Sequence, residues 1–175
     1  MPPQLAVLHS EDIPDEYIEE FSVSVSANGL DFATERTSLR GPFAGIEWLL
    51  PTAVIVYITK AYFDGFLKEM GKDHYLLLKA GATALLGKVG KVRLSLVGSS
   101  GKVSSKGEYS IGFSIILDIG ANYRLKLLVQ NELTEEQAER VMSSFFDFAE
   151  QFHAGLLDAR WSSSLSAVGL LVAPG

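Results

Sequence analysis

The spacing of apolar residues changes along the chain, and each spacing predicts a kind of element. The segment FSVSVSA, residues 21–27, alternates strictly between apolar and polar side chains. Asn28-Gly29, a pair typical of a type I′ turn, comes next, and the alternation resumes at residues 30–32. This pattern predicts a β-hairpin, preceded at residues 11–20 by a short acidic turn or helix that Ser10 caps.

Three later segments have apolar residues at the three-to-four-residue spacing of amphipathic helices. Residues 60–70 form the first, and Gly71 suits the position just after a helix end. A second helix is expected from there to Gly87 or Gly90. The third covers residues 134–157 and opens with a capping-box sequence, TEEQ.

Residues 52–59 are open to two interpretations. They are rich in β-branched side chains, which favours a buried strand. However, no turn residue separates them from Lys60, and Pro51 suits the first position of a helix. We expect one long buried helix that begins near Pro51, with a strand over residues 52–59 as the alternative.

Period-two alternation returns in the middle of the chain, over residues 91–96, 109–117 and 123–130. Short polar connections separate these segments, so we expect three strands in an antiparallel meander.

Together these elements predict an α+β fold. We expect a mostly antiparallel sheet of about five strands, with two central helices and one C-terminal helix packed on one face. Residues 1–160 form a single domain in this scheme. Residues 161–175 carry no charge and are apolar, and they are an edge strand, a docking segment or a disordered end.

Composition narrows the class of protein. The chain has 175 residues, of which 47 % are hydrophobic, and it contains no cysteine. This excludes disulfides and a thiol nucleophile and fits a reducing compartment, so we expect a cytoplasmic protein. The longest uncharged apolar run, residues 48–59, is shorter than the roughly 20 residues that span a membrane, and we expect no transmembrane segment.

Charge is distributed unevenly. The formal net charge is −6, and residues 1–40 hold eight acidic and two basic side chains. Residues 88–126 hold seven basic and two acidic side chains. An acidic chain of this kind is not expected to bind nucleic acid in general, because neutralisation of phosphates dominates that affinity.

The basic side chains of the predicted meander would gather on the sheet face that the helices leave open. The common reading of such a face is solvation and protection of sheet edges. The functional reading is a docking face for an acidic protein or a small anion. Its candidate binding residues are Lys91, Arg93, Lys102, Lys106, Arg124 and Lys126.

Candidate chemistry is sparse. The Gly/Ser/Lys-rich segment at residues 98–107 departs from a phosphate-binding loop in spacing and precedes a strand, so we read it as a hairpin connection and expect no cofactor. His9, His74 and His153 lack the spacing of metal ligands, and we expect no metal site. Glu47, within an apolar segment, is a candidate carboxylate of raised pKa.

Glu47 is more simply explained by a salt bridge to Arg36 or Arg40. Because the sequence contains no recognisable catalytic set of residues, we expect a non-catalytic protein-binding module that engages a partner protein or a second copy of itself. Size and composition fit a small intracellular bacterial accessory protein, such as an immunity protein or an adaptor. The alternative is a domain that binds a small anionic ligand or nucleotide on the basic sheet face. An enzyme using Glu47 and a histidine is a third hypothesis.

Overall fold

The structure, a computed structural model, describes residues 3–36, 52–92, 94, 109–118, 123–156 and 170–174. In chain order the elements are β1 (Leu5–His9), α1 (Asp15–Val25), β2 (Phe32–Arg36), β3 (Val54–Ile58), the π-helix η2 (Tyr62–Phe66), α2 (Leu67–Met70), α3 (Lys72–Val89), β4 (Tyr109–Asp118), β5 (Tyr123–Gln130), α4 (Glu135–His153) and β6 (Leu170–Pro174).

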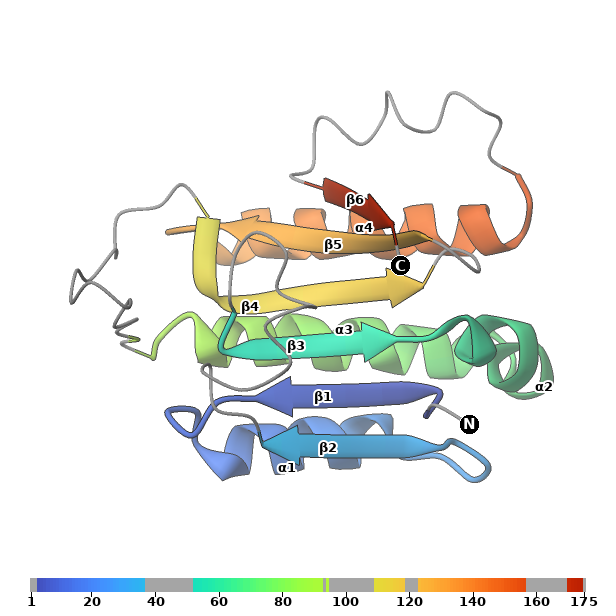
Figure 1. Cartoon of the computed structure of the whole chain (residues 1–175), viewed down its shortest axis with the longest axis horizontal. Helices are drawn as coiled ribbons and strands as arrows, with labels where there is room; N and C mark the ends of the chain where they lie inside the picture. The colour runs from blue at the N-terminus through green and yellow to red at the C-terminus, as the bar shows by residue number, and fades with distance from the viewer. Residues whose placement is uncertain are drawn as a thin grey trace.

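The described strands form one mixed sheet in the order β2-β1-β3-β4-β5-β6 (Figure 1). The pairs β1–β2 and β3–β4 are parallel, and the other three pairs are antiparallel. The α+β class is confirmed, but the prediction of a mostly antiparallel sheet is wrong. A tight turn cannot join two parallel strands, and each parallel pair here is connected through helix, α1 in the first and α2 with α3 in the second.

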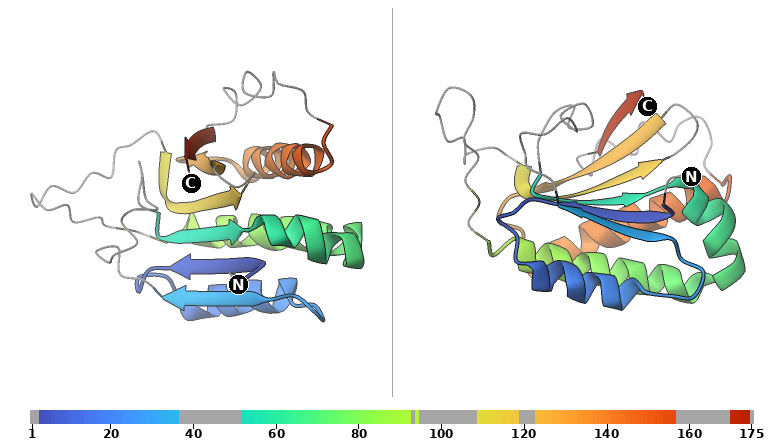
Figure 2. Two further views of the ribbon diagram at one scale, coloured as in Figure 1. Left: turned by 45° about the vertical axis from the view of Figure 1, so that its right-hand side comes forward. Right: turned by 60° about the horizontal axis from the view of Figure 1, so that its bottom comes forward.

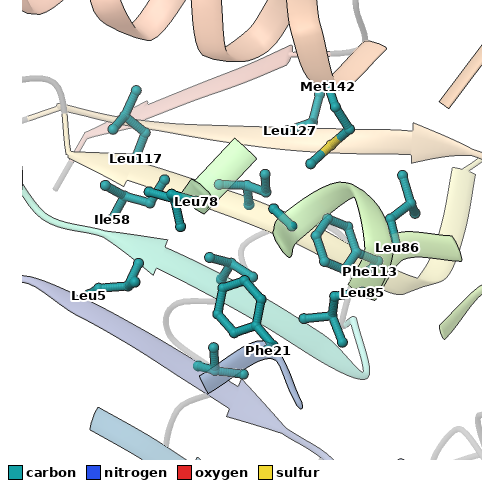
Figure 3. Close-up of a cluster of buried hydrophobic side chains, with 14 of the residues drawn as sticks. Leu5, Phe21, Ile58, Leu78, Leu85, Leu86, Phe113, Leu117, Leu127 and Met142 are labelled. Carbon is teal, nitrogen blue, oxygen red and sulfur yellow. The ribbon is translucent and has the colours of Figure 1, made fainter. Parts of the chain in front are cut away.

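Figure 2 shows α1, α3 and α4 on one side of this sheet. The side chains of the strands that face these helices form the hydrophobic core (Figure 3). Burial of apolar surface supplies the main stabilising free energy of such a layered fold. Core residues from the sheet are Leu5, Ile58, Phe113, Leu117 and Leu127, and those from the helices are Phe21, Leu78, Leu85 and Met142.

The hairpin predicted at residues 21–32 is wrong, because residues 15–25 form helix α1. Ile18, Phe21 and Val25 are buried at helical spacing, whereas the side chain of Val23 is 76 % exposed. This short segment satisfies both a two-residue and a helical period, and the connection between parallel β1 and β2 accommodates only the helix. The turn at residues 28–29 exists, but it links α1 to β2.

The long helix predicted from Pro51 is also wrong. Residues 54–58 form β3, which lies between β1 and β4, so the β-branched residues indicated the correct alternative. Val56 faces the core, and Ile55 on the opposite face is only 6 % exposed. A strand buried on both faces reads as a continuous apolar run, which is why its sequence resembles a buried helix.

Of the strands predicted in the meander, β4 and β5 are confirmed as an antiparallel pair. The described part of the segment at 91–96 is not a strand. Lys91 and Val92 belong to the turn that follows α3, where the Val92 N–H donates to the Val89 carbonyl. Residues 170–174 of the apolar tail form β6, which pairs with β5.

The ends of the longer helices agree with the sequence. Gly71 has a φ of 77° and separates α2 from α3, as expected for a residue without a side chain. The capping box at the start of α4 is present: Thr134 Oγ1 accepts from the Gln137 N–H, and Gln137 Oε1 accepts from the Thr134 N–H.

Candidate functional site

The structure describes three residues of the predicted basic face, and Lys91 lies apart from Arg124 and Lys126. Arg124 and Lys126 alternate along β5 with core residues and therefore lie on the sheet face opposite the helices. Lys91 is exposed in the turn after α3. Arg93, Lys102, Lys106 and Glu47 lie outside the described residues. The basic binding face therefore stays a prediction.

Arg124 belongs to a compact polar cluster on that sheet face. The Tyr57 hydroxyl lies 2.8 Å from each carboxylate oxygen of Asp118, and Arg124 Nε donates to Asp118 Oδ1 at 3.0 Å. Burial raises the pKa of Tyr57 to about 12, and the Asp118 carboxylate adds to the effect. Because Asp118 neutralises Arg124 locally, the cluster contributes more to cohesion between strands than to capture of an anion.

Lys126 is the second basic residue of β5, and its side chain is 0 % exposed. Its cross-strand neighbours are Ile116 on β4 and Leu171 on β6. A charge in this position is not available at the surface, so the sequence alone misjudges the exposure of Lys126.

The three histidines lie on different elements, β1, α3 and α4. His74 joins three segments: its Nδ1 lies 2.8 Å from the Tyr62 hydroxyl and its Nε2 lies 2.8 Å from the Val25 carbonyl. A carbonyl only accepts, so Nε2 carries the proton and Nδ1 accepts from Tyr62. His74 thus ties η2, α3 and α1 together. The described residues contain no group of three or more metal-ligating side chains.

A groove with a volume of about 1080 Å³ lies between α3 and α4. Helix α3 contributes one wall, α4 and the loop before it contribute the other, and Val129 of β5 lies at the floor. The lining residues from α3 and its end include Leu76, Lys79, Ala80, Thr83, Ala84, Leu86, Gly87, Lys88 and Lys91. Those from the other wall include Glu132, Leu133, Glu135, Ala138, Glu139, Arg140 and Ser143.

Small side chains explain why the two helices leave a gap. Toward the start of α3 they are joined, since Tyr75 donates a hydrogen bond to the Phe146 carbonyl and Lys79 Nζ donates to Ser143 Oγ at 2.8 Å. Beyond Lys79, the α3 residues that line the groove are mostly small (Ala80, Thr83, Ala84 and Gly87), with Leu86 and Lys88 beside them. The small side chains do not fill the space between neighbouring helices, whose axes lie about 8–10 Å apart even when packed closely.

The α3 wall also carries an exposed leucine. The side chain of Leu76 is 60 % exposed and lines the groove. The adjacent Leu77 is 51 % exposed and is not part of the groove lining. The two leucines have the same side chain and similar exposure, but only Leu76 lines the groove, so Leu77 is a suitable control for substitutions of Leu76.

Both walls of the groove carry charged side chains. Within the described residues, no ion pair reaches Glu132, Glu135 or Glu139, all of which line the groove. Two lysines of α3 that line the groove form ion pairs with other residues. Lys79 Nζ lies 3.7 Å from Asp147 Oδ1, and Lys88 pairs with Glu20 of α1. The groove lining thus holds these three glutamates together with four basic side chains, Lys79, Lys88, Lys91 and Arg140.

The sequence reasoning identified Lys91 but not the groove. The signal was present in "LLLKAGATALLG", residues 76–87, which is apolar almost all round the helix and rich in small residues. A helix of this composition is either buried on all sides or leaves an apolar surface exposed. An amphipathic helix, as expected from the sequence, does not tell whether this segment is buried on all sides or leaves an apolar surface exposed.

The chain was compared with known protein families, with curated proteins and with solved structures, and none of the three comparisons found a match. The described helices were also tested for membrane spans, and none is both long and apolar enough to cross a bilayer.

Proposed function

We propose that this protein is a non-catalytic binding module that engages another protein through the groove between α3 and α4. The observation that carries the proposal is the groove itself, about 1080 Å³ in volume, with the exposed Leu76 on its α3 wall and both acidic and basic side chains in its lining. An intracellular adaptor or immunity-type protein is the class we favour, and the absence of cysteine supports the cytoplasmic location.

The groove suits a protein segment better than a small molecule. Small-molecule sites typically enclose about 300–1000 Å³ and surround their ligand. Here the walls are two helix surfaces, and the lining runs along α3 from Leu76 to Lys88 and continues into the turn at Gly90 and Lys91. Burial of a leucine such as Leu76 by a partner would contribute about 1.5–3 kcal/mol.

The alternative function is binding of a small anion on the basic sheet face. Arg124 and Lys126 share that face, which supports the hypothesis. The pairing of Arg124 with Asp118 and the burial of Lys126 weigh against it. A rise in the thermal midpoint on addition of a nucleotide or inorganic phosphate, abolished in Arg124→Gln, would favour the anion site over the groove.

The groove is tested by affinity capture from the host with four baits: the wild type, Leu76→Glu, Leu77→Glu and the double variant Leu76→Glu/Leu77→Glu. We expect one protein to be captured by the wild type and by Leu77→Glu and to be lost with both Leu76→Glu baits. Circular dichroism establishes that each bait is folded. Equal capture by Leu76→Glu and Leu77→Glu, or no capture at all, would overturn the proposal.

A further inference from the structure

We infer that two copies of this chain associate through the outer edge of β6, with their β6 strands antiparallel across a twofold axis. This contact joins two six-stranded sheets into one continuous sheet. The surface is separate from the α3–α4 groove and does not depend on it. Three observations support the contact: the position of β6 in the sheet, its composition, and the distribution of charge along the sheet.

Strand β6 lies at one end of the sheet, and β2 lies at the other (Figure 1). In the part of the chain that the structure describes, β6 pairs with β5 and β2 pairs with β1, each along one edge. The outer edge of an end strand presents a row of backbone N–H and C=O groups, with which another strand can pair. Backbone geometry therefore offers two edges for docking.

Composition distinguishes the two edges. Strand β2 reads FATER, and the side chains of Thr34, Glu35 and Arg36 are exposed. Charged side chains on an end strand oppose pairing with another sheet. Strand β6 reads LLVAP, and residues 161–175 contain no charged side chain. Pro174 has no N–H to donate, but it is the last residue of the strand, so residues 170–173 remain able to pair.

An end strand without charge favours a second copy as the occupant. Two such strands pair without placing like charges opposite each other, and a copy is present wherever the chain is present. An edge reserved for a different protein needs features that prevent self-pairing, and residues 170–173 contain no charged side chain that would do so. Antiparallel pairing across a twofold axis uses the same backbone groups of both copies, as an isologous contact requires.

The charge distribution permits contact at β6 and opposes it at β2. Residues 1–40, which include β1, α1 and β2, hold eight acidic and two basic side chains and so account for the net charge of −6. Five strand spacings of about 4.8 Å, or about 24 Å, separate β2 from β6. This distance exceeds the Debye length of about 8 Å at physiological salt. Pairing through β6 keeps the two acidic ends apart, whereas pairing through β2 would bring them together.

The test is sedimentation velocity of the full chain over a series of concentrations. Four paired residues form a small contact, so we expect a weak, concentration-dependent equilibrium between monomer and dimer. Val172→Lys should raise the dissociation constant of the dimer about tenfold, because the twofold axis brings two like charges together. Val172→Glu should do the same. An equimolar mixture of the two variants should recover the dimer, because the charges that meet are then opposite.

Two control variants locate the contact. Thr34→Lys places the same charge on β2, at the other end of the sheet, and should leave the dissociation constant unchanged. Leu76→Glu changes the groove and should also leave it unchanged. Circular dichroism establishes that each variant is folded, and recovery of the dimer in the mixture shows that the Val172 variants retain β6.

The outcomes are distinct. Loss of the dimer in each Val172 variant, with recovery in the mixture, supports the β6 contact. A wild type that is monomeric at every concentration would overturn it, as would a dimer that Val172→Lys leaves intact or that Thr34→Lys disrupts equally. Loss without recovery would show that the substitutions act on the fold of a single chain and would also overturn it. Capture through the groove depends on Leu76, so either proposal can fail while the other stands.

Discussion

The imidazole of His153 stacks on the ring of Phe63, with ring centroids 3.8 Å apart and planes inclined by 6°. This contact joins the C-terminal end of α4 to η2. Among the described residues, His153 Nε2 is buried without a hydrogen-bond partner. Burial lowers the pKa of His153 from 6.5 to about 4, although the Asp64 carboxylate nearby acts in the opposite direction.

Stability should therefore depend on pH through His153. Its pKa is lower in the folded chain than in the unfolded chain, so the native state binds fewer protons in this range. The stabilisation is fully present above about pH 6.5 and is lost progressively as the pH falls toward 4. Urea unfolding between pH 7 and 5, above the range where most carboxylates titrate, should show a decline.

His153→Phe is the matched variant for this prediction, since it keeps an aromatic ring against Phe63 and removes the titrating group. Its unfolding free energy should be flatter over the same pH range. The neighbouring charges Lys60, Asp64 and Asp118 remain in place in this variant. An unchanged slope in His153→Phe would contradict the assignment to His153.

Two glycines of α3 should respond oppositely to alanine. Gly87→Ala should raise the unfolding free energy by about 0.5–1 kcal/mol, because a Cβ atom there meets nothing within 4 Å. Gly81→Ala should lower it by about 1 kcal/mol, because its Cβ atom would lie 2.7 Å from Ser24 Oγ and 3.3 Å from Val25 Cγ1. Chemical denaturation of both variants checks the pair, and changes of the same sign would refute this account of α1–α3 packing.

Glu132 should be a site of backbone strain. It has a φ of 60°, a conformation in which a side chain is unfavourable. Glu132→Gly should raise the thermal midpoint, with a gain of about 1 kcal/mol in unfolding free energy. Glu132→Ala keeps the unfavourable side chain at this φ, so it should show no such gain. A gain of equal size in Glu132→Ala would show that backbone strain is not the cause.

The Tyr57 hydroxyl should stabilise the helix-free face of the sheet. Tyr57→Phe removes its contact with the Asp118 carboxylate and should cost about 1.5 kcal/mol of unfolding free energy. Tyr17→Phe is the control, because the Tyr17 ring lies 5.5 Å from Lys88 Nζ and its hydroxyl makes no hydrogen bond in the described chain. Spectroscopic titration should also lose a phenol with a pKa of about 12 in Tyr57→Phe. Equal stability of the two variants would argue against the cluster.

Elements with a long, unambiguous period were predictable from sequence. Helix α4 and its capping box, the end of the helix at Gly71, and the β4–β5 pair depend on interactions between residues close in sequence. Short segments with two compatible periods were not predictable, as α1 and β3 show. In each of these the neighbouring strands, far away in sequence, decide between helix and strand.

The candidate site depended still more on the tertiary structure. Lys91 was the sole groove residue identified from sequence, and Arg124 and Lys126 lie on the other side of the sheet. The serial order of residues does not show that α3 and α4 run side by side, or that small residues on one of them face glutamates on the other. It also does not reveal that Lys126 is buried.

By itself, the sequence determined the α+β class, the acidic N-terminal charge and the limits of the most regular elements, because composition and short-range periodicity are properties of neighbouring residues. The tertiary structure alone decided the mixed direction of the strands, the exposure of each charge and the existence of the groove. Strand direction and helix spacing arise from contacts between distant parts of the chain, and no local pattern encodes which of those contacts will form.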